Sequence, residues 1–387
     1  MRIYLDHNAT TPLDPLVADR MTQALRDVWG NASSVHHFGQ QAKAALDEAR
    51  GAVAALLGAD ASEIVFTAGG TESDNIAIRG AAEALEPTGR RHLITSAIEH
   101  EAVLNTMKAL AKRGWRVTTL AVDASGIVSA DRLRDAITDD TALVSVMHAN
   151  NEIGTIQPIA ELAAIAHEHG ALFHTDAVQS AGKLSLDVHA LGVDMASIAG
   201  HKFYGPKGTG ALWLKRGVRL VPPTSGGRQE RNRRAGTENV PALVGFGVAA
   251  DVARRKLAAE GERLAALRDR LEAGILASVP GSERNGAPAP RVPNTTNVSI
   301  ERVESESLLI GLDLAGIAVS SGSACSSGTL EPSHVLKAMG LSHGRTLGSI
   351  RFSLGASNTD AEIDRVIEVL PPLVEKLRSL TTVSGRK

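Results

Sequence analysis

Short apolar segments alternate with helix-like segments through the first two thirds of the chain. This alternation predicts βαβ units, and hence a mostly parallel sheet with helices on both faces. Ligands of such sheets bind beyond the carboxyl ends of the strands. Strands are expected at 64–67, 92–95, 116–122, 142–147, 171–174, 195–199 and 210–214. Helices are expected at 14–27, 71–85, 101–112, 130–137 and 159–168, and a longer helix follows the polar stretch 30–39 and ends at about residue 57.

The pattern changes after about residue 250. A long charged helix is expected at 257–275, and the Pro/Gly-rich stretch 280–293 has the composition of a linker. Strands are expected at 297–300, 317–320 and 349–353, between helices. We therefore predict an α/β protein with two units. A large domain over 15–253 carries a seven-stranded sheet, and a smaller α+β domain combines 1–14 with 254–387 and carries the loop 320–328.

Composition excludes several classes of function. The 387 residues are 43% hydrophobic and 22% charged, and the net charge is −2. This balance favours neither nucleic acid nor an anionic membrane as a partner. The start of the chain has no apolar signal-peptide core and no run approaches 18 apolar residues, so we expect a cytoplasmic protein. The single cysteine, Cys325, excludes an intramolecular disulfide and a multi-cysteine metal site within one chain, although it could contact a metal cluster transiently.

Lys202 follows the apolar segment 195–199, which is expected to be a buried strand. Desolvation of an ammonium group is costly, so a lysine at this place needs a reason. One alternative is a side chain that extends to the surface beside a turn. The other is chemical, because a desolvated lysine has a lowered pKa and can form a Schiff base with an aldehyde cofactor.

Further polar groups follow other predicted strands. The glycine turn 68–75 leads into a helix, which is either an ordinary turn or a phosphate site that includes Thr71. Asp176 is either a turn residue or a partner for a pyridinium nitrogen, and the asparagines of 148–154 could donate to a ring oxygen. His100 is either a surface residue or a group that stacks on a ring and moves protons. Together with Lys202 this set fits pyridoxal phosphate.

The loop 320–328 places Cys325 among small and polar residues, without a bulky apolar neighbour. Such a composition indicates an exposed loop and a thiolate that acts as a nucleophile, rather than a core cysteine. Arg351 lies inside an apolar segment. Its planar group suits a substrate carboxylate, and a structural ion pair is the alternative.

These motifs, taken in order, resemble the cysteine desulfurases of the iron–sulfur-cluster type, which are class V aminotransferase-like, fold-type I pyridoxal phosphate enzymes. The resemblance covers essentially the whole chain and rests on many ordered motifs. The cysteine motif is similar to that of the group with a long catalytic loop. The matching segments are 4–12, 69–75, 150–154, 200–202, 234–239 and 321–326.

The resemblance implies a role for each candidate residue. Lys202 would bind the cofactor and move the substrate Cα proton, and Cys325 would take the substrate sulfur as a persulfide and release L-alanine. Asp176 would pair with the pyridine nitrogen, Gln179 would bind the ring oxygen, and His100 would stack on the ring. Phosphate contacts are implied for Gly70, Thr71 and His201 and, from the partner subunit of a homodimer, for Thr237; Asn151 and Arg351 would bind the substrate carboxylate.

Two positions depart from the family pattern. Ala199 stands where many relatives have a phosphate-binding serine, so that contact is either missing or supplied by Ser197, and Arg228 adds a charge near the expected dimer edge. Two alternative functions stay open. One is a selenocysteine lyase or another β-lyase of this fold, and the other is a non-catalytic scaffold. The sulfur acceptor, whether a cluster scaffold or a thiolation enzyme, is not specified by the sequence.

Overall fold

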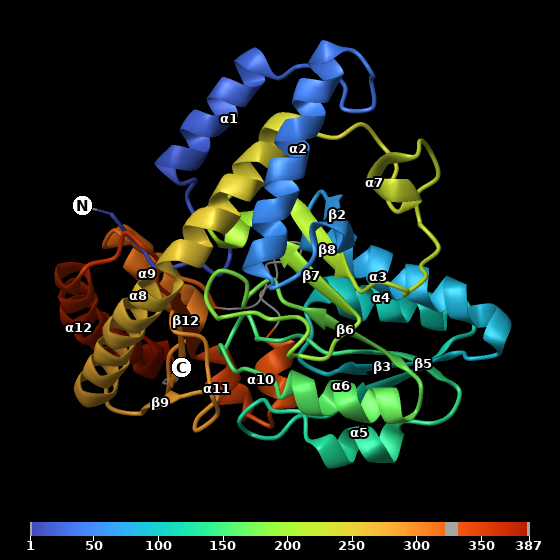
Figure 1. Cartoon of the computed structure of the whole chain (residues 1–387). Coiled ribbons are helices and arrows are strands. Elements are labelled where there is room, and N and C mark those ends of the chain that lie inside the picture. Colours follow the sequence, from blue (N-terminus) through green and yellow to red (C-terminus); the bar gives the residue numbers. More distant parts are fainter. Residues whose placement is uncertain (1, 322–331, 385–387) are drawn as a thin grey trace.

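A seven-stranded sheet forms the centre of the larger part of the molecule (Figure 1). The computed structural model describes residues 2–321 and 332–384. The strand order is β2-β8-β7-β6-β5-β3-β4, and β8 runs antiparallel to both of its neighbours while the other pairs are parallel. This confirms the predicted fold class. The strands are β2 (Ile64–Thr67), β3 (His92–Ser96), β4 (Arg116–Leu120), β5 (Thr141–Ser145), β6 (Leu172–Asp176), β7 (Met195–Ala199) and β8 (Gly210–Leu214).

Helices cover both faces of this sheet (Figure 1). Successive residues of a strand point to opposite faces, so Leu143 packs in one apolar cluster and Val144 in the other. Burial on both faces explains why these strands are apolar throughout rather than alternating. One face is covered by α3 (Gly70–Leu85) and α4 (Glu101–Ala111), and the other by α2 (His37–Leu56), α5 (Ala130–Ala136) and α6 (Ile159–Glu168). Helix α1 (Pro15–Asp27) packs against α8 (Val240–Ser278).

The longest helix, α8 (Val240–Ser278), has 39 residues and begins well before the predicted start at residue 257. Glycines in its first turns weaken the helical signal of the sequence, but packing requires them. A Cβ atom at Gly247 would lie 2.5 Å from the Cα atom of Ala49 in α2. The close approach of α8 and α2 therefore stabilises a segment whose intrinsic helix propensity is low.

A second apolar core lies beside the far end of α8 (Figure 1). It contains a three-stranded antiparallel sheet in the order β12-β10-β9 and a parallel pair of β1 with β11. The segment 280–293, predicted as a linker, instead contains β9 and is part of this core's sheet, because its backbone pairs with β10. The elements are β1 (Ile3–Tyr4), β9 (Ser282–Arg284), β10 (Thr295–Ile300), α9 (Ser305–Leu314), β11 (Ile317–Ala318), β12 (Ser349–Ser353) and α12 (Asp360–Ser384).

The predicted domain boundary at 253/254 falls within α8. Ala250 is the last residue of this helix in the first core, and Leu264 is its first residue in the second. The boundary stays a prediction, since one helix continues through both cores. Within the described ranges, 2–321 and 332–384, no helix is both long and apolar enough to cross a membrane.

Candidate active site

A cavity of about 390 Å³ opens beyond the carboxyl ends of the central strands, where the two cores meet. We call the part that follows from the seven-stranded sheet and its helices the cavity floor. The part contributed by segments that join the second core is the cavity wall. The floor consists of Gly70, Thr71, Asp74, His100, Met147, Asn151, Asp176, Val178, Gln179, Ala199, His201 and Lys202, and the wall of Asn8, Ala9, Ser320 and Arg351.

Lys202 lies in a short 3-10 turn directly after β7, so the strand delivers it to the cavity. Its Nζ atom donates to the backbone oxygens of Asn8 at 2.6 Å and Ala9 at 2.9 Å. Burial, together with the nearby Arg351 charge, lowers the pKa of Lys202 to about 8. Near neutral pH the uncharged fraction of this amine is therefore much larger than that of an ordinary lysine, and an uncharged amine is the form that attacks an aldehyde.

One end of the floor is suited to an anion. Helix α3 begins at Gly70, and its first N–H groups have no partner within the helix. A Cβ atom at Gly70 would lie only 2.6 Å from Val178 Cγ2, so this turn requires glycine. Thr71 is exposed beside it, and His201 lies near, with Nδ1 3.2 Å from Thr10 Oγ1. Burial and neighbouring lysines lower the pKa of His201 to about 4, so its imidazole is neutral.

The other end of the floor is acidic. Asp176 is 5% exposed at the end of β6 and accepts from Val178 N–H at 2.9 Å. Burial raises the pKa of Asp176, and burial with the charge of Asp176 raises the pKa of Asp74 well above its usual value. The pKa of the buried Glu99 is raised to about 8, mainly by burial. Three desolvated carboxyl groups favour a cationic group of a ligand at this place.

Ser197 belongs to a buried polar network under the floor and does not line the cavity. Its Oγ atom lies 2.9 Å from His174 Nε2, and His174 Nδ1 lies 2.8 Å from Ser145 Oγ. The structure therefore gives Ser197 a hydrogen-bond partner other than a phosphate. Ala199, on the same strand, is the residue whose side chain lines the cavity.

His100 is the N-cap residue of α4. Its Nδ1 atom accepts a hydrogen bond from Ala102 N–H at 3.1 Å. The acceptor role of Nδ1 places the proton of the neutral ring on Nε2. His100 is exposed and lines the cavity, so this Nε2–H group can serve a ligand.

Gln179 is held by two groups that the sequence analysis did not assign. Its Nε2 atom donates to Asn8 O at 3.0 Å, and its Oε1 atom accepts from Lys183 Nζ at 2.7 Å. Asn8 O also accepts from Lys202, so one backbone oxygen joins the expected cofactor lysine to the expected ring-oxygen donor. The spacing of four residues from Gln179 to Lys183 was the signal for Lys183 in the sequence. Asn8 and Asp74 lie in the matching segments 4–12 and 69–75, but the sequence analysis gave neither of them a role.

Arg351 is 4% exposed in β12 and forms the cationic part of the wall. Its Nη2 atom lies 2.6 Å from Asp6 Oδ1, and its Nη1 atom donates to Asn151 O at 2.9 Å. The sequence analysis left two roles open for Arg351, a structural ion pair and binding of a substrate carboxylate. The residue has the ion pair, and it also borders the cavity where a substrate could bind.

The two neighbouring asparagines differ in place. Asn150 is buried and donates to Ile98 O, and its Oδ1 atom accepts from the N–H groups of the next turn. Asn151 lines the cavity. Asn150 therefore shapes the turn that presents Asn151.

Besides Ser197, two further predicted site residues are not brought into this cavity by the described chain. Thr237 is exposed and lies outside the lining of the cavity. Cys325 falls outside the described residues. Among the residues that are described, no group of three or more His, Cys, Asp or Glu side chains could hold a metal ion.

Comparison with known proteins places this site in a family. The model of the aminotransferase class-V family matches residues 3–366. The chain is 52% identical over 379 residues to the cysteine desulfurase of Trichormus azollae, covering 98% of this chain and 94% of that protein. It is 49% identical to the cysteine desulfurase IscS of Methanosarcina thermophila, covering 100% and 95%.

Solved structures agree with this placement. A NifS-like protein has a TM-score of 0.88 and 37% identity, covering 99% of this chain and 100% of that chain. A structure described as SspA in complex with cysteine has a TM-score of 0.82 and 39% identity, covering 92% and 99%. The chain belongs to the aminotransferase class-V family.

Proposed function

We propose that this protein is a pyridoxal phosphate-dependent cysteine desulfurase. The observation that carries the proposal is the position of Lys202, which has a lowered pKa and shares one cavity with Asp176 and with the start of α3. Relatives whose sequences are about 50% identical to this one along nearly the whole chain carry the name cysteine desulfurase. One structural neighbour is described as a complex with cysteine.

The residues of the cavity fit this cofactor. The start of α3, Thr71 and the neutral His201 would hold its phosphate, and Gln179 would donate to its ring oxygen. Asp176 would pair with its ring nitrogen, and a cation there would relieve the raised pKa of this buried carboxyl group. The cofactor, when bound, supplies an electron sink that weakens bonds at the substrate carbons.

The side chains divide the remaining work. Lys202, once released by substrate, would hold and move the proton of the substrate Cα atom. His100 would exchange protons through Nε2, because its Nδ1 atom is occupied by a backbone N–H group. Arg351 and Asn151 would bind the substrate carboxylate.

Sulfur transfer is assigned to Cys325. Its thiolate would attack the substrate sulfur, the carbon–sulfur bond would break, and a persulfide would form on Cys325 as L-alanine leaves. A sulfur-acceptor protein, such as a cluster scaffold or a thiolation enzyme, would then remove the outer sulfur.

We also propose a cytoplasmic homodimer. Thr237 lies outside the cavity of its own chain, which agrees with a contact to the site of a partner subunit. The stacked rings of Trp29 and Phe38, 66% and 44% exposed, offer an apolar surface that a second subunit would cover.

The test compares the wild-type protein with Cys325→Ala, each given L-cysteine or L-selenocysteine. Loss of alanine and sulfide formation from L-cysteine, with the spectral change on substrate binding retained, is the expected result. Full cysteine turnover by the variant would overturn the persulfide mechanism and favour the lyase alternative. A wild-type protein that binds no pyridoxal phosphate would overturn the whole proposal.

A further inference from the structure

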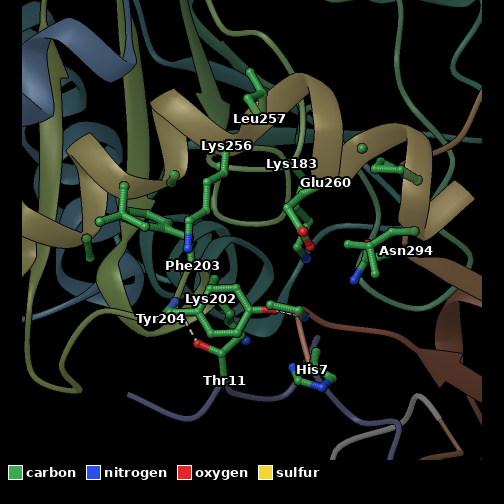
Figure 2. A pocket seen from close by; sticks show the side chains of 18 of the residues that line it. His7, Thr11, Lys183, Lys202, Phe203, Tyr204, Lys256, Leu257, Glu260 and Asn294 are labelled. Carbon is green, nitrogen blue, oxygen red and sulfur yellow. Dashed lines mark hydrogen bonds between the residues drawn. The ribbon is translucent and has the colours of Figure 1, made fainter. Parts of the chain in front are cut away.

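Lys183 is a partly buried lysine at the back of the candidate site, and it has no carboxylate partner in the described structure. It follows α6 and β6 in the loop toward β7, and its Nζ atom donates to Gln179 Oε1 at 2.7 Å and to Asn8 Oδ1 at 2.9 Å. Gln179 lines the cavity, whereas Lys183 stands behind it and borders a second, separate cavity (Figure 2). Lys183 therefore contacts the site only through other residues.

The Nζ atom of Lys183 donates to two amide oxygens, Asn8 Oδ1 and Gln179 Oε1, and this donation decides the orientation of the Gln179 amide. The end of the Gln179 amide that faces Lys183 must be the oxygen, so the other end must be the NH₂ group. The backbone oxygen of Asn8 at 3.0 Å from Nε2 agrees with this assignment. Gln179 thus presents an obligate donor to the cavity.

We propose that Lys183 is a positioning residue, which holds the Gln179 amide so that its NH₂ group faces the ring oxygen of the cofactor. This inference rests on the proposed function, because it concerns how that site receives pyridoxal phosphate. A freely turning amide would offer its oxygen to an anionic ring oxygen part of the time, and the contact would then be repulsive. Lys183 removes this second orientation.

The anchor of Lys183 is itself fixed. Asn8 is 1% exposed, and its Nδ2 atom donates to Asn151 O and to Thr295 Oγ1. Its Oδ1 atom must therefore face Lys183, as the 2.9 Å distance shows. Asn8 of the wall therefore fixes Lys183 by a hydrogen bond, and Lys183 in turn fixes Gln179 of the floor.

The charge of Lys183 could also act directly on the cofactor lysine, and the test must separate the two routes. Burial, followed by the charges of Lys202 and Arg351, lowers the pKa of Lys183 well below its usual value. Lys183 in turn contributes to the lowered pKa of His7 and of His201. A direct effect would not depend on Gln179, whereas positioning would.

The experiment is a double-mutant cycle on the pyridoxal phosphate-loaded protein without substrate. Wild type, Lys183→Met, Gln179→Leu and the double variant are titrated with pH, and the midpoint of the visible absorption change is recorded. Loss of a donor to the ring oxygen makes that oxygen more basic, so the cofactor's bound proton is held more tightly and the midpoint rises. We expect Lys183→Met to raise the midpoint by about one pH unit, a tenfold change in proton affinity.

The double variant decides between the routes. Its midpoint should equal that of Gln179→Leu alone, because positioning has no effect once the amide is absent. Lys183→Arg keeps an N–H donor and should restore most of the wild-type midpoint. Lys256→Met is the matched control, since this exposed lysine of α8 lines the second cavity of Figure 2 and should leave the midpoint unchanged.

Three results would overturn the inference. They are an unchanged midpoint in Lys183→Met, a full additional shift in the double variant, and a shift of equal size in Lys256→Met. Thermal unfolding of the cofactor-free proteins shows whether each variant is folded, and Lys183→Leu replaces the methionine variant where folding fails. A wild-type protein without a visible band would instead overturn the proposed function, and this inference with it.

Discussion

The floor and the wall of the cavity handle charge in opposite ways. In the floor, Asp74, Asp176 and the adjoining Glu99 are buried, and none of the three forms an ion pair with a lysine or arginine in the described structure. In the wall, Arg351 is equally buried but lies 2.6 Å from Asp6. The carboxyl groups of the floor therefore tend to keep their protons, because burial makes an uncompensated negative charge costly, while the charge of the wall is already compensated.

This difference indicates what each part receives. A desolvated carboxyl group gains most from a ligand that brings its own positive charge, as a protonated pyridine ring would. A paired arginine binds an incoming carboxylate by exchanging or sharing its partner, so binding there costs part of an existing ion pair. The floor is thus suited to a resident cofactor, and the wall to a substrate that binds and leaves.

The largest effect on activity is expected when the reactive amine of the floor, that of Lys202, is removed. Lys202→Ala should lower turnover of L-cysteine by roughly 10³-fold or more, because it removes the amine that would hold the cofactor and move the substrate Cα proton. Pyridoxal phosphate bound to this variant should be removable by dialysis even after borohydride treatment, because reduction cannot link it covalently to an alanine; absorbance of the dialysed protein checks this. Lys215→Ala, in the exposed half of an ion pair with Asp194, serves as the control. Cofactor that stays attached to the denatured variant after borohydride reduction would contradict the role of Lys202.

The wall is tested by Arg351→Gln. We expect kcat/KM for L-cysteine to fall by about 10²-fold, mostly through KM, because a buried charge contact with the substrate carboxylate contributes about 3 kcal/mol. Steady-state kinetics measure this. Arg345→Gln removes an outer ion pair with Glu283 and should leave KM unchanged. An unaltered KM in Arg351→Gln would mean that the arginine has only its structural role with Asp6.

The acidic floor predicts a pH-dependent stability. The pKa of Glu99 in the folded protein is about 8, above its ordinary value near 4.5. Between these values the folded state binds more protons than the unfolded state, so stability is greatest at the acidic end and falls as pH rises. From pH 6 to pH 7.5 this group should remove about 2 kcal/mol.

Glu99→Gln isolates that effect. A glutamine keeps an oxygen that can accept from Ser96 Oγ and from Met147 N–H, the two donors recorded for Glu99. Urea unfolding of the cofactor-free protein at both pH values should show a smaller loss of stability in the variant than in the wild type. Equal losses in the two proteins would show that Glu99 is ionised in the folded state.

The smallest effects are expected at two neighbouring asparagines, of which Asn151 lines the cavity and Asn150 is buried beneath it. Asn150→Ala leaves three backbone groups without their recorded partner and should lower the free energy of unfolding by about 2 kcal/mol. Asn151→Ala should change it by less than about 0.5 kcal/mol and should instead raise KM for L-cysteine. Unfolding curves and kinetics on both variants check this, and equal destabilisation would remove the distinction.

The sequence allowed the central sheet to be predicted because its strands are continuous apolar runs bounded by glycine, proline and polar turns. The convergence of Lys202, Asp176 and His100 followed from their positions after such strands. The contact of Lys183 with Asn8 could not be predicted, since it joins residues 175 positions apart and depends on how the two cores pack. The early start of α8 was missed because its glycines serve tertiary packing rather than local propensity.

Helix α8 also determines how the two cores respond to stress. At 39 residues it is about 58 Å long, and it supplies buried side chains to both cores. Loss of structure in one core would unwind part of a helix on which the other core depends, so we expect the two to unfold as one cooperative unit. The continuous helix α8 therefore spans the junction that contains the cavity. Relative motion of the two cores would require this helix to bend, rather than a flexible hinge to rotate.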